Sequence, residues 1–126
     1  MTKERPLILI LDRDTAVRAS LKFALELEGL TVVGCATRED LLGHARLHQA
    51  RCVVLDGRSL GVQTFDVLKE LKAVKLKVPV ILVVSSITEG IRRRAKAAGA
   101  SYVIEKPFLD SALLEAIQDA IPGKQP

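Results

Sequence analysis

The 126-residue sequence predicts an α/β fold, a doubly wound parallel sheet of five strands with helices on both faces. The length suits one domain, because two cores in so short a chain would each be marginal. The composition is that of a globular protein, with 48% hydrophobic and 27% charged residues. Short apolar runs alternate with longer stretches of helical spacing in the order βαβαβαβαβα, which is typical of a parallel sheet.

The five expected strands are short, continuous apolar runs rich in Val, Ile and Leu. Each is too short for a helix, and the absence of polar alternation favours strands that are covered on both faces. They are expected at residues 7–11, 31–35, 52–55, 80–84 and 102–104.

The stretches between these runs carry apolar residues three and four positions apart, which indicates helices with one buried face. Gly29 and Gly99 end two of them, and Thr37 and Thr64 are candidate N-caps. We expect helices over residues 15–28, 38–49, 65–75, 89–98 and from about Asp110 to Ile121. The domain is expected to cover residues 1–121, and residues 122–126 are interpreted as a linker or frayed C-terminal tail.

The composition limits which partners and which cellular compartment we expect for this protein. No apolar run approaches the ~20 residues that span a bilayer, and the N-terminus does not resemble a secretory signal. Two cysteines in such a chain indicate reduced thiols, so a cytoplasmic location is expected. A net charge of +4 allows contact with acidic partners but is only weak support for it. Four aromatic residues are few for a surface that stacks nucleic-acid bases, so direct nucleic-acid binding is not expected.

Polar residues follow four of the five expected strands, and in a parallel sheet these positions meet at one edge. Carboxylates, hydroxyls and an ammonium gathered there suit an anionic phosphoryl group, with or without a divalent cation. The residues are Asp12-Arg13-Asp14 after the first strand, Asp56 after the third, Ser85-Ser86 after the fourth and Glu105-Lys106-Pro107 after the fifth.

An ordered set of short motifs resembles the receiver domains of two-component response regulators. The stretches are Ile10-Leu11-Asp12 with Val17-Arg18 and Ser20-Leu21, Val53-Val54-Leu55-Asp56 with Gly61, Val78-Pro79-Val80-Ile81, and Ala97-Ala98-Gly99-Ala100 leading to Glu105-Lys106-Pro107-Phe108. The resemblance covers nearly the whole chain. It implies a flavodoxin-like (CheY-like), doubly wound (βα)5 fold with strand order 2-1-3-4-5.

The resemblance also implies roles for individual residues. Asp56 would accept a phosphoryl group from a histidine kinase or a phosphotransfer protein, Lys106 would hold a phosphoryl oxygen, and Asp12 would join Asp56 in an acidic Mg²⁺ pocket. Such a domain is a phosphoacceptor rather than a turnover enzyme, although its relatives often hydrolyse their own acyl phosphate slowly. Output would pass to an effector protein or a downstream domain, and homodimerisation is left open.

The sequence departs from the family pattern at the expected metal pocket. Arg13 stands where the family places a second acid that binds the metal directly, and a guanidinium cannot be a Mg²⁺ ligand. Asp14 is a substitute ligand only if it is not the N-cap of the first helix. We therefore expect Mg²⁺ binding that is weakened or absent, and an atypical member of the family.

A second departure lies at the switch that relays phosphorylation. Val84 stands at the usual hydroxyl position, and Ser85 replaces it only if the backbone bulges. Val103 stands at the usual aromatic position, beside Tyr102.

Two alternatives stay open at this point. In one, the chain is a pseudo-receiver, a protein-interaction module in which Arg13 pairs with Asp56 or Asp12 in place of a metal. In the other, Asp12-Arg13-Asp14-Thr15 resembles the motif of haloacid-dehalogenase-like phosphatases, with Asp12 as nucleophile and Asp14 as general acid. Against the second, only Asp110 follows Lys106 where those enzymes place an acidic pair.

The remaining candidates concern surfaces and thiols. Arg92, Arg93 and Lys96, with Tyr102, are candidate interface residues, because the family docks partners on the elements expected here over residues 89–98, 102–104 and 110–121. His44 and His48 have the spacing of a zinc pair on one helix, but a solvated helix face is the simpler interpretation. Cys35 and Cys52 are expected to be buried thiols on strands too far apart to bridge.

Overall fold

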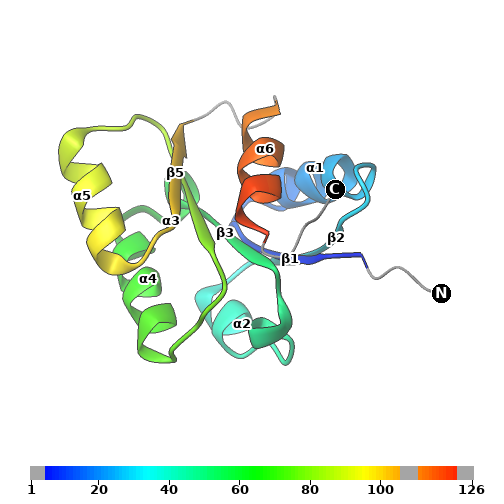
Figure 1. Cartoon of the computed structure of the whole chain (residues 1–126), viewed down its shortest axis with the longest axis horizontal. Coiled ribbons are helices and arrows are strands. Elements are labelled where there is room, and N and C mark those ends of the chain that lie inside the picture. The colour runs from blue at the N-terminus through cyan, green and yellow to red at the C-terminus, as the bar shows by residue number, and fades with distance from the viewer. Residues whose placement is uncertain (1–4, 106–110, 122–126) are drawn as a thin grey trace.

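The computed structural model describes residues 5–105 and 111–121 (Figure 1). All five strands pair in parallel, in the order β2-β1-β3-β4-β5, as the sequence predicts. The strands are β1 (Leu7–Leu11), β2 (Thr31–Cys35), β3 (Cys52–Asp56), β4 (Val80–Val84) and β5 (Tyr102–Glu105).

The helices follow the predicted alternation, with three differences. They are α1 (Thr15–Glu26), α2 (Arg38–Leu42), α3 (Gly57–Leu60), α4 (Thr64–Ala73), α5 (Glu89–Ala98) and α6 (Ser111–Ala120). The first difference is that Thr64, a predicted N-cap, is instead the first residue of α4, and Gln63 is the N-cap. The helix predicted over residues 38–49 is wrong in length: α2 ends before Gly43, and the chain continues into a 3-10 turn, η1 (Leu47–Gln49). The short α3 and the 3-10 turn η2 (Gly61–Gln63), which follow β3, were not predicted.

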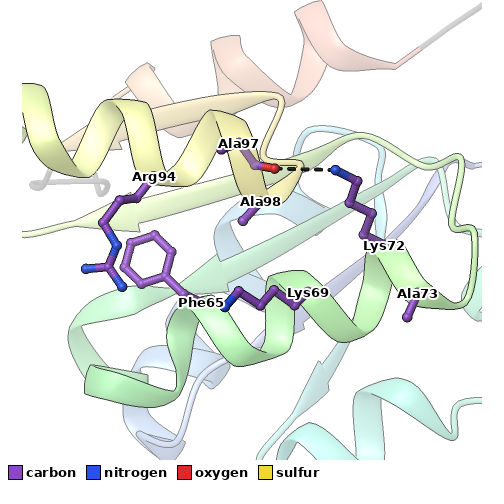
Figure 2. Close-up of a pocket in the computed structure, with 7 residues that line it drawn as sticks. All are labelled: Phe65, Lys69, Lys72, Ala73, Arg94, Ala97 and Ala98. Carbon is purple, nitrogen blue, oxygen red and sulfur yellow. Dashed lines mark hydrogen bonds between the residues drawn. The ribbon is translucent and has the colours of Figure 1, made fainter.

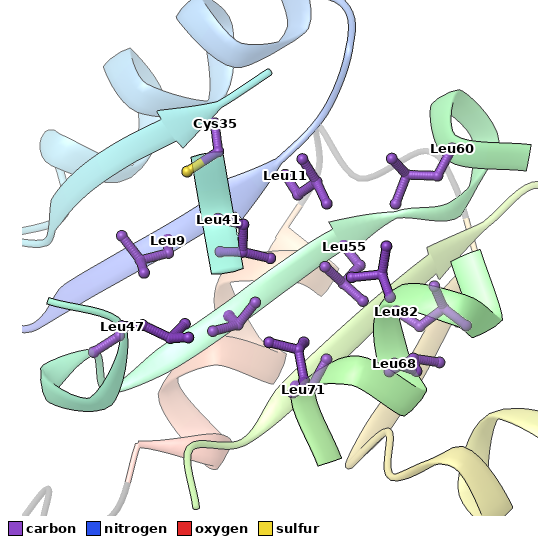
Figure 3. Close-up of a cluster of buried hydrophobic side chains, with 14 of the residues drawn as sticks. Leu9, Leu11, Cys35, Leu41, Leu47, Leu55, Leu60, Leu68, Leu71 and Leu82 are labelled. Carbon is purple, nitrogen blue, oxygen red and sulfur yellow. The ribbon is translucent and has the colours of Figure 1, made fainter. Parts of the chain in front are cut away.

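Two apolar layers sandwich the sheet, one on each face. Leu21 and Leu25 of α1 and Leu113 and Ile117 of α6 pack on one face. The other face is covered by leucines of α2, η1 and α4 and by two alanines of α5; Figure 3 shows this leucine-rich cluster against β1, β3 and β4. Burial on both sides explains why the three central strands, β1, β3 and β4, are continuously apolar, whereas the edge strands β2 and β5 are only partly buried.

The strand register sets which residues meet at the carboxyl edge of the sheet. Leu11 of β1 pairs with Leu55 of β3, so Asp12 and Asp56, the next residue of each strand, come side by side. Side chains alternate along a strand. Both acids therefore share the parity of Ile10 and Val54, which face the layer of α1 and α6.

The thiols and histidines are accounted for by this fold. Cys35 and Cys52 are free and buried on β2 and β3, which β1 separates, as predicted. His44 and His48 do not share a helix, because His44 lies in the turn after α2 and His48 in η1. Within residues 5–105 and 111–121, no helix is both long and apolar enough to cross a membrane.

Candidate functional site

Two carboxylates are buried together at the carboxyl ends of β1 and β3. Asp12 is fully buried, and Asp56 is 3% exposed. The backbone N–H of Asp14 donates to Asp12 Oδ1 at 2.8 Å, but no donor among the described residues reaches Asp12 Oδ2. A buried acceptor without a donor is costly, so this pocket is built for chemistry or charge rather than for packing alone.

Arg58 neutralises Asp56 through a two-pronged ion pair. Its Nε donates to Asp56 Oδ1 at 3.0 Å, and its Nη2 donates to Oδ2 at 2.9 Å. The backbone N–H of Arg58 also donates to Oδ1 at 3.0 Å, which makes Asp56 the N-cap of α3. The fork geometry of guanidinium and carboxylate makes such a pair both strong and well oriented.

The turn that joins the two residues is closely packed. A Cβ on Gly57 would lie 2.9 Å from the backbone oxygen of Val83 and 3.2 Å from Leu82 Cδ1. Only glycine fits against β4 at this position without a backbone shift. Gly57 therefore lets α3 begin directly after Asp56, so that Arg58 returns to the Asp56 carboxylate.

Ser59 ties this turn to the loop after β1. Its hydroxyl donates to the backbone oxygen of Asp56 at 3.2 Å and accepts from the N–H of Arg13 at 3.1 Å. The Arg13 guanidinium turns outward and donates to the Gln63 side chain. The hypothesis that Arg13 pairs with Asp56 or Asp12 is thus wrong about the arginine, because Arg58 supplies the cation.

The two acids titrate in opposite directions because their neighbours differ. Burial, with the neighbouring Asp56, raises the pKa of Asp12 to about 7. Burial opposes ionisation of Asp56 too, but hydrogen bonds from Arg58 and from the Asp12 carboxyl outweigh it and lower the pKa of Asp56. Near neutral pH the pocket holds an ionised Asp56 paired with Arg58, beside a carboxyl that takes up a proton readily.

The donor set does not fit a divalent cation as it stands. Of the residues that the structure describes, no three His, Cys, Asp or Glu side chains cluster closely enough to hold a metal ion. Asp14, the predicted substitute ligand, is the N-cap of α1, where its Oδ1 accepts from Ala16 and Val17. Both oxygens of Asp56 are engaged by Arg58, which leaves Asp12 Oδ2 as the one oxygen of the acid pair that no described donor reaches.

The other predicted site residues are placed as follows. Ser85 is exposed just after β4 and lines a cavity of about 380 Å³ with Arg58, Gly57 and Val84. Val84 ends the strand, and the N–H of Ile87 donates to Glu105 at 2.9 Å, which ties the loop after β4 to the end of β5. Lys106 lies outside the described residues.

Arg58 is the site residue that sequence analysis missed. The signal for it was the tripeptide Asp56-Gly57-Arg58, since an acid can cap a turn that returns a basic side chain two residues later. The family pattern indicated Arg13 as the cation of the pocket instead.

Comparison with known proteins agrees with this geometry. The family model for the response regulator receiver domain matches residues 8–118. The chain belongs to this family, whose members receive phosphate from histidine kinases, act on effector domains and generally bind Mg²⁺ for phosphorylation. Receiver domains are signalling domains rather than conventional enzymes, so the phosphatase alternative is set aside.

Among its relatives is the transcriptional regulatory protein FixJ of Azorhizobium caulinodans, 32% identical over 112 residues, covering 89% of this chain and 53% of that protein. The crystal structure of FixJ-N superimposes with a TM-score of 0.80 at 28% identity, covering 98% of this chain and 99% of that one. The chemotaxis protein CheY4 of Vibrio cholerae shares the fold, with a TM-score of 0.83 at 19% identity over 93% of this chain and 99% of that one. The chain spans about half the length of the FixJ relative.

Proposed function

We propose that Asp56 accepts a phosphoryl group from a phosphohistidine of a histidine kinase or phosphotransfer protein. The observation that carries this proposal is the ionised, buried Asp56 carboxylate at the carboxyl end of β3, beside Asp12. This is where ligands bind in open parallel sheets, and carboxylates are established nucleophiles toward phosphorus.

The transfer requires one Asp56 oxygen to form a bond to phosphorus while the phosphorus–nitrogen bond to the donor histidine breaks. The electron pair of that bond goes to the imidazole, and the product on this chain is an acyl phosphate. Catalysis of this kind depends mainly on positioning and charge neutralisation. Lys106 is proposed to hold a phosphoryl oxygen, and Ser85, in the loop after β4, is proposed to offer it a hydroxyl.

Arg58 is proposed to control access to the acceptor. Because the guanidinium engages both carboxylate oxygens, one of them must be released before it can attack. The same guanidinium then lies within reach of the arriving phosphoryl oxygens, where Arg is well suited to pair with phosphate. Arg58 would thus slow phosphorylation and stabilise its product against self-hydrolysis, which we propose is slow.

Mg²⁺ binding is proposed to be weak. A cation at the acid pair would have to displace the Arg58 guanidinium from Asp56, and Arg13 offers no carboxylate in compensation. The metal would be held by Asp12 and Asp56 and would supply further charge neutralisation when bound.

The experiment treats the protein with acetyl phosphate, in Mg²⁺ and in EDTA, and records intact mass over time. We expect an adduct of one phosphoryl group on the wild type and on Asp14→Asn, and none on Asp56→Asn. Arg58→Ala is expected to form the adduct roughly tenfold faster, a difference of about 1.4 kcal/mol in barrier. An adduct that persists on Asp56→Asn would contradict the assignment.

A pseudo-receiver is the second candidate, and the Arg58–Asp56 pair favours it. In that case Arg58 permanently supplies the positive charge that a metal ion would otherwise bring. The domain then acts by protein contacts alone. Absence of an adduct on both wild type and Arg58→Ala, with circular dichroism unchanged, supports this candidate. Adduct on Arg58→Ala alone would assign the block to Arg58.

Output is proposed to pass through α5, β5 and α6 to an effector protein or a downstream domain, in the cytoplasm. Arg92, Arg93 and Lys96 are exposed on α5, while Tyr102 is half-buried on β5 and packs against the core. Reversing Arg92 and Arg93 to Glu is expected to weaken binding of the effector and to reduce its dependence on salt.

A further inference from the structure

A groove between α4 and α5 combines an apolar floor with cations that have no acidic partner in the part of the chain that the structure describes. Its volume is about 490 Å³, and it is lined by Phe65, Lys69, Lys72, Ala73, Arg94, Ala97 and Ala98. Figure 2 shows α4 supplying the first four of these residues and α5 the other three. Neither acid of the pocket lines this α4–α5 groove, although Phe65 also lines the cavity beside Arg58. The groove shares α5 with the effector surface proposed above and adds α4 to it.

The three cations of the groove differ in the interactions that they already make. Lys72 donates to the backbone oxygen of Ala97 at 3.4 Å, so its ammonium is held by the last turn of α5. Arg94 lies over the ring of Phe65, 4.0 Å from the centroid. Among the described residues, neither Arg94 nor Lys69 makes an ion pair, and no acidic residue lines the groove.

Stacking on Phe65 orients the Arg94 guanidinium without consuming its N–H donors, which are the donors that bind a carboxylate in a fork. Lys69 lies on the opposite wall, so Phe65 is flanked by two available cations in Figure 2. The alanines leave room between the helices that larger side chains would fill. An apolar side chain can therefore sit on the floor while carboxylates beside it meet the rim.

We propose that the α4–α5 groove binds an acidic segment of a partner protein, in which glutamate or aspartate flanks an apolar side chain. Charge complementarity selects this occupant, since every charged side chain that lines the groove is positive, and Arg92, Arg93 and Lys96 add to the positive field on α5. Nucleic acid fits less well, because a phosphate backbone makes no use of a floor of alanine and phenylalanine. The inference is independent of the chemistry at Asp56.

The test selects a display library of random dodecapeptides on the full chain and measures the enriched peptides by fluorescence anisotropy. We expect them to be acidic with at least one large apolar residue. The groove variant Lys69→Glu/Arg94→Glu should weaken their binding at least about tenfold. The control Lys75→Glu/Lys77→Glu also takes the net charge from +4 to zero but alters lysines outside the groove, and it should weaken binding less than about threefold.

Three results would overturn the proposal. One is enrichment of peptides with no acidic bias, and another is an equal loss of binding in the two variants. The third is tighter binding of a random-sequence DNA duplex that the groove variant alone abolishes, which would make the surface a nucleic-acid site. Thermal unfolding of both variants checks that the fold is retained.

Discussion

Arg58 in the acid pocket and Arg94 in the α4–α5 groove carry the same guanidinium group in opposite electrostatic surroundings. Arg58 is fixed by both oxygens of a buried carboxylate, whereas Arg94 rests on an aromatic ring with no acidic partner among the described residues. The pocket is charge-compensated from within, and the groove is not. A compensated site resists a new ligand until its internal pair opens, while an uncompensated surface is ready for an external anion.

The largest expected difference is in stability. Arg58→Ala leaves an ionised, buried Asp56 beside Asp12, so we expect the free energy of unfolding at pH 7 to fall by about 3 kcal/mol. Arg94→Ala removes the same side chain from an exposed position and is expected to cost about 0.5 kcal/mol. Urea unfolding of the two variants measures both values. Equal losses would mean that the Asp56 ion pair is no more important to the fold than a surface contact.

A smaller difference in stability is expected between alanine substitutions at two glycines. Gly57 lies in the turn beside the acid pocket, and Gly90 lies in α5, which forms one wall of the α4–α5 groove. Gly57→Ala places a methyl group 2.9 Å from the oxygen of Val83, and the resulting strain should cost about 2 kcal/mol. The Cβ of Gly90→Ala, in α5, would have its nearest neighbour at 3.9 Å, so helix propensity should stabilise the protein by about 0.5 kcal/mol. Thermal unfolding followed by circular dichroism gives the sign of each change. A neutral Gly57→Ala would show that the turn after Asp56 has space to relax.

The sequence predicted the sheet well because the signal for buried strands is local. Continuous Val, Ile and Leu runs can be satisfied only by burial on both faces, and β1, β2 and β4 begin and end at the predicted residues. The helix over residues 38–49 was wrong since apolar spacing does not separate one long helix from α2 followed by η1. Leu41 and Leu47 are both buried, the first in α2 and the second in η1.

The site was only partly predictable for a different reason. The pairing of β1 with β3 brings Asp12 to Asp56, and alternation of elements is enough to infer it. The direction of a long side chain depends on backbone turns a few residues long. The turn at Gly57 returns Arg58 to Asp56, whereas Arg13 leans away to Gln63, and no periodic pattern reports either choice.

A pH-dependent effect is expected at Asp12, the member of the acid pair without an ion-pair partner among the described residues. Because burial raises the pKa of Asp12 to about 7 from an unfolded value near 3.8, folding binds a proton within this window. The contribution of Asp12 to stability is therefore complete below about pH 4 and is lost as the pH rises to about 7. Asp12→Asn keeps an acceptor for the N–H of Asp14, offers Asp56 an amide donor and carries no charge at any pH.

Stability curves from pH 4 to 8 test this directly. Asp12→Asn should flatten the decline and be more stable than the wild type at pH 8, while the difference should vanish or reverse near pH 4. Asp14→Asn removes one carboxylate from the exposed cap of α1 and controls for the change in net charge. A wild-type curve without a decline between pH 4 and 7, or with a decline that Asp12→Asn does not remove, would mean that Asp12 is ionised throughout this range. Arg58 would then have to compensate both acids of the pocket, not Asp56 alone.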